Sequence, residues 1–353
     1  MMIKMKMFTK DTRLLGILEA AMNGVCPDKD ACRYMLTFHE ASAEASLIRI
    51  AANDIMRKKS DNSAIILGQV GVDVSECTGG CKFCTFGEGH TKFIPKRLSD
   101  EELYAKISGF NEKEDLYGLF LMTMHDYDLS VFLNSVNIAK SIVPSTTKIW
   151  ANVGDSSLDA FKEMKKAGVE GVYHVCRIGE GRDTNLRPED RIKTMENALD
   201  AGLKLYTCCE PIGPEQTIDE IVDNMFIGIE LGCTQHACMR RVAVPGAPLA
   251  KYRQISELRL GQFVAVVALA SFGTPTMTYC GVHEPNEIAY VSGANIITAE
   301  AGANPRDNKD DTSENRGMDM EDCRTMLLES GFQYIRRGDE SKIPLTFDYV
   351  KGE

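Results

Sequence analysis

The spacing of hydrophobic positions along the chain changes near residue 63. Residues 11–59 place apolar side chains at helical intervals among good helix formers, which predicts helices in LLGILEAAMNG and in HEASAEASLIRIAANDIMRKK. From there, short β-rich runs alternate with amphipathic stretches, beginning with the strand-like SAIILGQVGVDV. The pattern predicts an N-terminal helical segment, residues 1–60, followed by a domain of alternating strands and helices.

The alternation continues to the end of the predicted domain, residues 61–303. Further strands are predicted in LYGLFLMTM, TKIWANVG, VEGVYHVCRIG, LKLYTCCEPIG, TQHACMRRVAV, TPTMTYCGV and ANIITAEAG. The helices between them carry end signals, such as Ser99 as an N-cap, Gly168 and Gly202 after helices, and a Pro opening PEDRIKTMENALDAG. About eight strand–helix repeats in roughly 240 residues predict an α/β fold of the parallel (β/α) TIM-type barrel, with a doubly wound open sheet as the alternative.

The last segment, residues 304–353, differs from the alternating strands and helices before it in composition and pattern. NPRDNKDDTSENRG at 304–317 is polar and rich in turn formers, which predicts a mobile loop. A last helix is predicted in MDMEDCRTMLLES, and a short tail ends in VKGE.

Composition narrows the class of protein. The 353 residues are 44% hydrophobic and 26% charged, which is ordinary for a soluble globular protein. A net charge of −11 argues against a nucleic-acid partner. The longest apolar run, FVAVVALASF at 263–272, is about half the ~20 residues that a membrane span needs. Because the start, MMIKMKMFTKD, lacks the apolar part of a signal peptide, we expect a cytoplasmic protein without a membrane partner.

Three of the twelve cysteines lie within eight positions of SECTGGCKFCTF, residues 75–86. Cys77, Cys81 and Cys84 form C-x3-C-x2-C directly after a predicted strand, where the first βα loop of a barrel would lie. Three thiolates on one loop can bind three irons of a 4Fe-4S cluster. Gly79 and Gly80 would let the backbone pass close to inorganic sulfur, and Phe83 would shield one cluster face.

Two other interpretations of these cysteines stay open. A structural zinc ion needs a fourth ligand to complete its tetrahedron, and His90, six residues after the last cysteine, is a candidate. Usual zinc sites, however, pair two short C-x2-C or H-x3-H steps. The second alternative is that the cysteines are ordinary small buried residues.

The cysteine motif, with an aromatic residue before its last Cys and a strand before it, resembles the signature of the radical S-adenosylmethionine (radical SAM) superfamily. The resemblance implies that the thiolates of Cys77, Cys81 and Cys84 bind three irons, and that the fourth iron is chelated by the amino and carboxylate groups of S-adenosyl-L-methionine. It further implies reductive cleavage of that molecule to a 5′-deoxyadenosyl radical, which abstracts hydrogen from an unactivated carbon. The protein's part is then to bind, orient and exclude water.

Residues 60–340 resemble the branch that contains biotin synthase, the hydrogenase maturase HydE and methylornithine synthase (PylB). The resemblance implies S-adenosylmethionine contacts from TMHDYD at 123–128 and from RIGEGRDTNLRPEDR at 177–191, the candidates being His125, Asp126, Arg177, Glu180 and Arg191. EPIGPEQT resembles the segment that supports the adenine, although it departs from the usual Gly-rich form, and SGANIITAEAG resembles the last barrel strand. The alternative is a surface ion pair for Arg177 and Glu180 and a solvated helix position for Arg191.

Five further cysteines lie near predicted strand ends, which meet at one mouth of a barrel; they are Cys176, Cys208, Cys209, Cys238 and Cys280. Alternation along a strand would place Cys176 with His174, and Cys208 with Glu210. A second iron–sulfur cluster is therefore possible, as in biotin synthase, where it donates sulfur. The positions do not match those of biotin synthase, since WANVG has no Cys and TYCGV no Arg. Free cysteine is also a common small core residue.

These observations favour a radical SAM enzyme of cofactor biosynthesis. The extra cysteines favour sulfur insertion, a transferase reaction of the biotin or lipoyl synthase type. The alternative is a carbon-skeleton rearrangement or metallocofactor assembly, as in methylornithine synthase or the hydrogenase maturase, and a different class would be a non-enzymatic iron–sulfur or zinc protein. The expected partners are a small-molecule or carrier-bound substrate and an electron donor such as flavodoxin or ferredoxin.

Overall fold

A closed barrel of parallel strands forms the centre of the computed structural model, which describes residues 7–87, 89–90, 92–302 and 318–352. Within these residues, eight strands follow one another around the barrel: β1 (Ser63–Gly71), β4 (Leu116–Met122), β5 (Lys148–Asn152), β6 (Val169–Tyr173), β7 (Lys204–Ile212), β8 (Gln235–Arg240), β9 (Tyr279–Val282) and β10 (Ile296–Gly302). Parallel pairing of β10 with β1, from Ile296 opposite Ile65 to Gly302 opposite Gly71, closes the sheet. The predicted TIM-type barrel is confirmed, and the open sheet is excluded.

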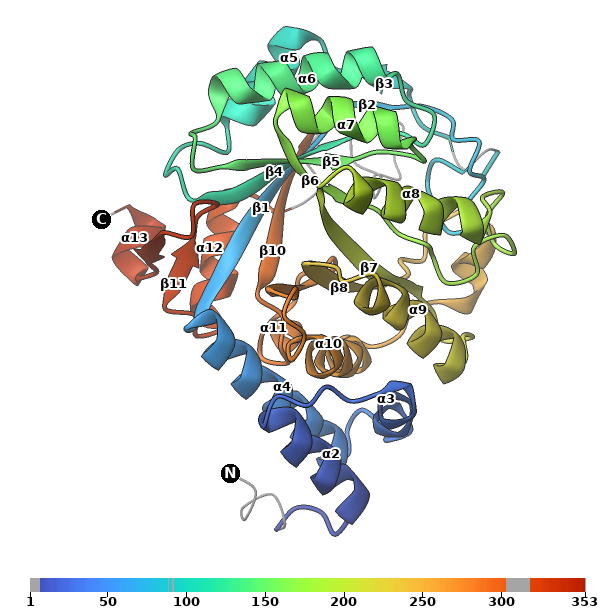
Figure 1. Ribbon diagram of the computed structural model, residues 1–353, viewed down its shortest axis with the longest axis vertical. Helices are drawn as coiled ribbons and strands as arrows, with labels where there is room; N and C mark the ends of the chain where they lie inside the picture. Colours follow the sequence, from blue (N-terminus) through green and yellow to red (C-terminus); the bar gives the residue numbers. More distant parts are fainter. Residues whose placement is uncertain (1–6, 88, 91, 303–317, 353) are drawn as a thin grey trace.

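Helices cover the outside of the barrel (Figure 1). They are α5 (Asp100–Ser108), α6 (Leu129–Ile142), α7 (Leu158–Ala167), α8 (Pro188–Asp200), α9 (Ile218–Glu230), α10 (Glu257–Ser271) and the short α11 (Glu287–Tyr290). The predicted end signals are used: Ser99 and Glu102 form a capping box at α5, Gly168 ends α7 with a left-handed backbone, and Pro188 is the first residue of α8.

The apolar run at 263–272 lies in α10, and all residues from Leu260 to Ser271 are buried. The helix packs between strands β8 and β9 on one side and α4 on the other, which is why it is hydrophobic all round. The N-terminal helices α2 (Thr12–Met22), α3 (Lys29–Leu36) and α4 (Ala43–Ser60) lie together beside it, at the lower end of Figure 1. Among the described residues, no helix is long and apolar enough to span a membrane.

The segment after the last barrel strand is more ordered than the predicted short tail. The predicted helix is α12 (Met320–Glu329), and it is followed by β11 (Tyr334–Arg336), β12 (Lys342–Pro344) and α13 (Phe347–Lys351). β11 pairs with the first residues of β1 and with β12. Local pattern did not predict these strands because each has only three residues. The loop predicted at 304–317 lies outside the described residues.

The turn between β11 and β12 covers the amino-terminal end of the barrel. The Glu340 carboxylate accepts hydrogen bonds from the hydroxyls of Tyr117 and Tyr279, at 3.2 and 2.9 Å, and from Lys148 Nζ at 3.3 Å. Above them the fully buried Trp150 fills the interior. Gly171 makes room for this ring, since a Cβ at that position would lie 2.2 Å from Trp150 Cζ3. The barrel is thus filled and capped at this end, and any cavity must lie at the other.

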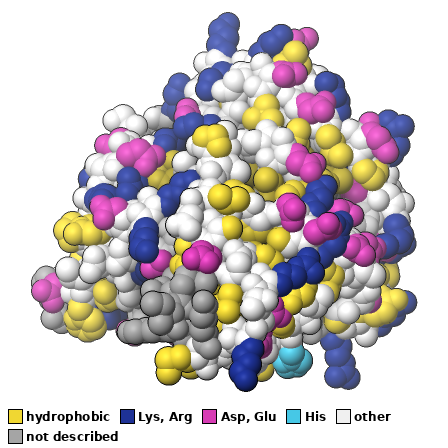
Figure 2. Space-filling model, turned by 60° about the horizontal axis from the view of Figure 1, so that its bottom comes forward, with side chains coloured by type: hydrophobic (Ala, Val, Ile, Leu, Met, Phe, Trp, Pro, Cys, Tyr) yellow, Lys and Arg dark blue, Asp and Glu magenta, His cyan; other side chains and the backbone are white. Residues whose placement is uncertain are grey.

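Charges of both signs are mixed on the surface. In the view of Figure 2, Lys and Arg side chains are interspersed with Asp and Glu rather than gathered by sign. The face in this view therefore offers no broad basic patch of the kind that a nucleic-acid backbone requires.

One buried ion pair joins the C-terminal segment to the barrel. Nε and Nη2 of Arg324, on α12, donate to the Asp115 carboxylate just before β4, at 2.7 and 2.9 Å, and both side chains are almost completely buried. The Tyr349 hydroxyl donates to the same carboxylate at 2.8 Å. Loss of the guanidinium would leave a buried anion without its counter-ion.

We predict that Arg324→Leu lowers the free energy of unfolding by about 3–5 kcal/mol, as expected for breaking a buried pair. Urea unfolding followed by circular dichroism measures this quantity. The control is Lys162→Leu, because Lys162 forms an exposed pair with Asp159 and should change stability by about 1 kcal/mol or less. Equal losses in the two variants would contradict the prediction.

Candidate cofactor and active site

A cavity of about 240 Å³ opens at the carboxyl ends of the barrel strands. Cys77, Cys81 and Cys84 line one side of it. Its other polar walls come from all eight barrel strands, the segments after them and α8, and include Gln69, His125, Asn152, His174, Arg177, Arg191, Glu210, Arg241, His283 and Glu300. The cavity lies where (β/α) barrels place their chemistry.

The cysteine loop turns back on itself between β1 and β4. β2 (Asp73–Val74) and β3 (Lys96–Arg97), two short strands that sequence reasoning missed, pair at its base. Backbone hydrogen bonds connect Cys77 with Phe86 and Cys84 with Cys81, at 3.1 and 3.0 Å. The loop therefore brings the three thiols to one wall of the cavity.

The loop after β6 holds the cysteine loop in place. The Asn185 backbone N–H donates to Gly79 O at 2.8 Å, and its side chain donates to Thr78 O at 3.1 Å. Gly80 has a left-handed backbone, and a Cβ there would lie 2.4 Å from Asn185 Nδ2, so only glycine fits this contact. The two loops thus form one packed unit.

Apolar side chains shield the thiols from water. Val74, Phe86 and Met124 form a small buried cluster against which Cys77 and Cys84 pack. The Phe86 backbone N–H donates to Cys84 Sγ at 3.4 Å, and burial raises the pKa of Cys81 to about 12. Partial burial with backbone N–H donors is typical of sulfur ligands to iron.

The arrangement differs from that of a single zinc site. Thiolates on one tetrahedral zinc lie about 3.8 Å apart, given Zn–S bonds of about 2.3 Å. In the described part of the chain, the cysteine loop contributes no set of three ligand atoms that all lie within 4.8 Å of one another, and His90 joins no such set. His90 instead packs against Gly87, and its buried Nδ1 has no hydrogen-bond partner among the residues that the structure describes. Wider spacing of the thiols suits a multi-iron cluster better than one ion.

Arg177 and Glu180 are not the surface ion pair that the sequence left possible. The Glu180 side chain is 1% exposed and accepts from the Arg177 backbone N–H at 2.9 Å and from the Thr184 hydroxyl at 2.6 Å. It therefore fixes the loop, and among these residues it is Arg177 that lines the cavity. The Arg177 guanidinium lies 3.3 Å from Glu210 and contributes positive charge near Cys81.

Arg191 is buried on α8 and lines the cavity, so it is not a solvated helix residue. Its Nη1 donates to Asp155 Oδ1 at 2.8 Å, and its Nε donates to Val175 O at 3.0 Å. Asp155 also accepts from His174 Nε2 at 3.1 Å. Sequence reasoning missed Asp155, although a carboxylate three residues after a strand end was the signal available.

His125 and Asp126 follow β4 and take different places. His125 lines the cavity, and burial lowers its pKa. Asp126 accepts a hydrogen bond from the hydroxyl of Thr78, which lies in the cysteine loop directly after Cys77. The structure therefore brings His125, Arg177 and Arg191 to the cavity, and it uses Asp126 and Glu180 to hold the loops.

The five cysteines suggested for a second cluster are divided by the sheet. Cys208 belongs to the barrel interior, whereas Cys209, Cys238 and Cys280 belong to the core between the strands and the outer helices. Cys176 lies three residues beyond the end of β6, so strand alternation does not pair it with His174, and it does not line the cavity. One cluster cannot be held from both faces of a sheet, so these five residues do not form one ligand set.

A polar group that was only partly foreseen lies deeper in the cavity. Glu210 accepts from the Tyr173 hydroxyl at 2.8 Å, and His283 Nε2 lies 2.9 Å from the Tyr206 hydroxyl. Burial would raise the pKa of Glu210, but the His283 and Arg177 contacts lower it to about 2. The sequence indicated Glu210 through its alternation with Cys208 along a strand, but no sequence pattern around His283 indicated a role for that residue.

No known family profile matches this sequence, and no curated protein matches it. Solved structures do match. The hydrogenase maturase HydG from Carboxydothermus hydrogenoformans has a TM-score of 0.72 at 12% identity, over 91% of this chain and 78% of that one. A second HydG structure gives 0.75 at 15% identity, over 94% and 77%. Methylornithine synthase (PylB) gives 0.73 at 16% identity, over 90% of this chain and 96% of that one.

This chain has the fold of HydG and PylB. The likeness covers 90–94% of this chain, and methylornithine synthase is covered nearly end to end. The resemblance drawn from the cysteine motif is thereby confirmed at the level of the fold. The maturase reported above is HydG, whereas the sequence resemblance named HydE.

We predict that His174 makes the protein sensitive to acid. Burial, followed by the charge of Arg191, lowers its pKa from 6.5 to about 3. Between pH 6.5 and 3, His174 is therefore protonated in the unfolded chain but neutral in the folded chain. The free energy of unfolding falls as the pH drops through this range, by at most about 1.4 kcal/mol per pH unit.

His174→Gln, which can still donate to Asp155, should flatten this slope in urea unfolding measured over that pH range. The same substitution at His39, whose side chain is 77% exposed, serves as the control and should leave the slope unchanged. An acid slope in His174→Gln equal to that of the unsubstituted protein would show that His174 is not its source.

Proposed function

We propose that this chain is a radical SAM enzyme that acts on a small substrate in the barrel cavity. The observation that carries the proposal is the C-x3-C-x2-C loop, whose three thiols line the same cavity as His125, Arg177 and Arg191. The fold shared with HydG and PylB supports the proposal, since the sequence resemblance named the same branch.

The residues of the cysteine loop and the cavity fit the cofactors of that class. Cys77, Cys81 and Cys84 would hold a 4Fe-4S cluster, because thiols are its usual ligands and these three lie partly shielded by Phe86 and Met124. When bound, the cluster and S-adenosylmethionine supply an electron and a 5′-deoxyadenosyl radical for hydrogen abstraction. The chain's own part is to hold these groups at one wall of a cavity and to exclude water from it.

Positive charge in the cavity would orient S-adenosylmethionine. Arg177 and Arg191 both line it, but Asp155 and Val175 O already hold Nη1 and Nε of Arg191. Arg177 is nearer to the cysteine loop and its side chain is 24% exposed, so it is the better partner for a carboxylate. Arg191 then acts chiefly by fixing Asp155 and the strand end.

The outcome that we favour is a carbon-skeleton rearrangement or cofactor assembly rather than sulfur insertion. Sulfur insertion was suggested by cysteines at strand ends, yet among those five only Cys208 belongs to the barrel interior. The nearly complete overlap with the fold of methylornithine synthase points the same way. The reaction also requires an external one-electron donor, for which flavodoxin or ferredoxin is the proposed partner.

We predict that the anaerobically reconstituted protein, given S-adenosylmethionine and a strong reductant, forms 5′-deoxyadenosine. Cys81→Ala should abolish it, because an iron of the cluster would lose its thiolate. Liquid chromatography of the quenched reaction measures the product.

The matched control is Cys209→Ala, since that thiol is equally buried but lies on the outer face of the sheet. It should leave the yield unchanged. The radical SAM proposal fails if the unsubstituted protein with an intact cluster forms no 5′-deoxyadenosine, or if Cys81→Ala forms as much.

We also predict that Arg177→Met weakens S-adenosylmethionine binding by about 10- to 150-fold, which corresponds to the ~1.5–3 kcal/mol of a hydrogen bond to a charged group. Calorimetric titration of the reconstituted protein measures the dissociation constant. Arg182→Met is the control, because Arg182 is in the same loop but pairs with Glu220 at the surface. A similar affinity in both variants would remove Arg177 from the proposed role.

A further inference from the structure

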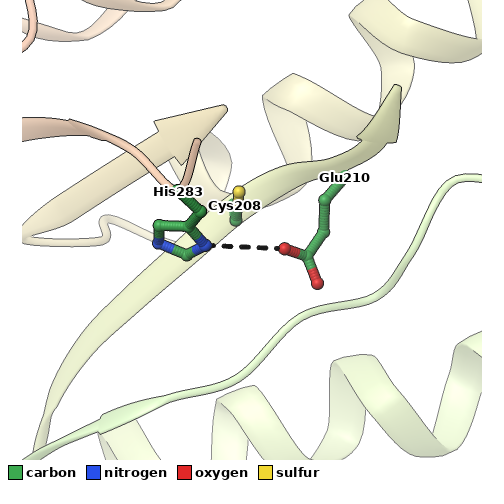
Figure 3. Close-up of side chains that lie close together, drawn as sticks. All are labelled: Cys208, Glu210 and His283. Atoms are coloured by element: carbon green, nitrogen blue, oxygen red, sulfur yellow. Dashed lines mark ion pairs between the residues drawn. The ribbon is translucent and has the colours of Figure 1, made fainter. Parts of the chain in front are cut away.

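Three side chains of different chemistry converge in the barrel beside Arg177, which lies 3.3 Å from one of them, Glu210. The ligand atoms of Cys208, Glu210 and His283 all lie within 4.8 Å of one another (Figure 3). It is the only such group of three among the residues that the structure describes. Cys208 and Glu210 are buried, and His283 is partly buried. The assigned cluster and S-adenosylmethionine residues do not include any of them.

The barrel topology creates this convergence. Cys208 and Glu210 are two positions apart near the end of β7, and Figure 3 shows the Glu210 carboxylate directed toward His283, with Cys208 drawn between them. His283 is the first residue after β9, two strands along the barrel. β8 lies between these strands, and its inward-facing Ala237, opposite Cys208 in the register, leaves room for the imidazole to reach across.

The distances are close to those of ligands on one metal ion. His283 Nδ1 lies 3.7 Å from Glu210 Oε2. Nitrogen and oxygen ligands on one tetrahedral zinc, with bonds of about 2.1 Å, lie about 3.4 Å apart. Small side-chain rotations that shorten the distance between these two atoms by a few tenths of an ångström would therefore complete the geometry for this pair.

The surrounding groups orient the ligand atoms. The Tyr206 hydroxyl lies 2.9 Å from His283 Nε2, so that Nε2–H can donate to it. Nδ1, which lies 3.4 Å from the Tyr173 hydroxyl and 3.7 Å from Glu210 Oε2, is then the ligand atom. Arg177 takes the other carboxylate oxygen, Oε1 of Glu210, and the Tyr173 hydroxyl donates to Oε2 at 2.8 Å. Second-shell hydrogen bonds of this kind accompany metal-binding histidines and carboxylates in proteins.

We propose that Cys208, Glu210 and His283 form a mononuclear Zn²⁺ site in the floor of the cavity. One sulfur, one nitrogen and one oxygen ligand suit zinc, whereas Mg²⁺ and Ca²⁺ prefer oxygen alone. The Cys208 thiolate and the Glu210 carboxylate would balance the charge of the ion. Binding requires the thiol proton to leave to solvent.

The fourth coordination position faces the cavity, because Glu210 and His283 both line it. Three protein ligands with one open position are the pattern of zinc sites that bind a substrate or water. The site therefore takes a substrate with a carboxylate or amine donor, and it would fix that group in the cavity that the cysteine loop also lines. The site does not depend on S-adenosylmethionine.

The test uses the full chain with Cys77, Cys81 and Cys84 all replaced by Ala, so that no cluster competes for metal. Co²⁺ serves as the probe because a cobalt–thiolate bond gives a charge-transfer absorption band. We expect one Co²⁺ per chain with this band, displaced by Zn²⁺. No metal binding, or binding without the thiolate band, would overturn the proposal.

Variants made in this background locate the site. Cys208→Ala and His283→Gln should remove the cobalt band, while Cys209→Ala, which alters a buried thiol on the opposite face, should retain it. Tyr206→Phe keeps all three ligands and should weaken Zn²⁺ binding by about 10- to 100-fold through loss of its hydrogen bond to His283. A band that survives Cys208→Ala would assign the metal to other cysteines and reject the site.

A measurement without further substitutions guards against loss of fold in the variants. Zinc K-edge X-ray absorption of the zinc-loaded protein should show one sulfur at about 2.3 Å and nitrogen or oxygen neighbours at about 2.0–2.2 Å. Two or more sulfurs in the first shell would overturn the proposal. Because the cluster thiols are absent here, failure of this test leaves the radical SAM proposal untouched, and failure of 5′-deoxyadenosine formation leaves the zinc site untouched.

Discussion

Pairing of β10 with β1 is the constraint on which the site depends. Seven register pairs, from Ile65 with Ile296 to Gly71 with Gly302, join the last barrel strand to the first. Since parallel strands all end on the same side, closing the sheet brings the loops after β1, β4, β6 and β7 around one opening. Cys81, His125, Arg177 and Glu210 are far apart in sequence, and this closure makes them neighbours across one cavity.

The two ends of the barrel interior contain different kinds of side chain. Toward the amino-terminal end, Trp150 and the tyrosines above Glu340 fill the space. Toward the other end, polar side chains replace apolar ones, and each buried charge has a partner, such as Asp155 for Arg191 and Arg177 for Glu210. Pairing of this kind makes a charged cavity tolerable inside a folded protein, because an unpaired buried charge would cost several kcal/mol.

Much of the fold could be predicted from the sequence, and the site only in part. Alternating strands and helices were visible because each strand is a continuous apolar run, and C-x3-C-x2-C was visible because its spacing is local. The direction of a side chain was harder. Cys176 follows a strand that ends at Tyr173, so alternation gave no guide to it, and His283 joins Glu210 only through the barrel register. Strands β11 and β12 were too short to leave a pattern.

The plug formed by Glu340 at the base of the barrel has a consequence for traffic through the protein. With that end sealed by Tyr117, Tyr279 and Lys148, the barrel is a vessel with one mouth. Any molecule that binds in the cavity then enters and leaves at the carboxyl ends of the strands. Substrate and cofactor would share this entrance, which is set by the architecture of the barrel rather than by the affinity of any one site.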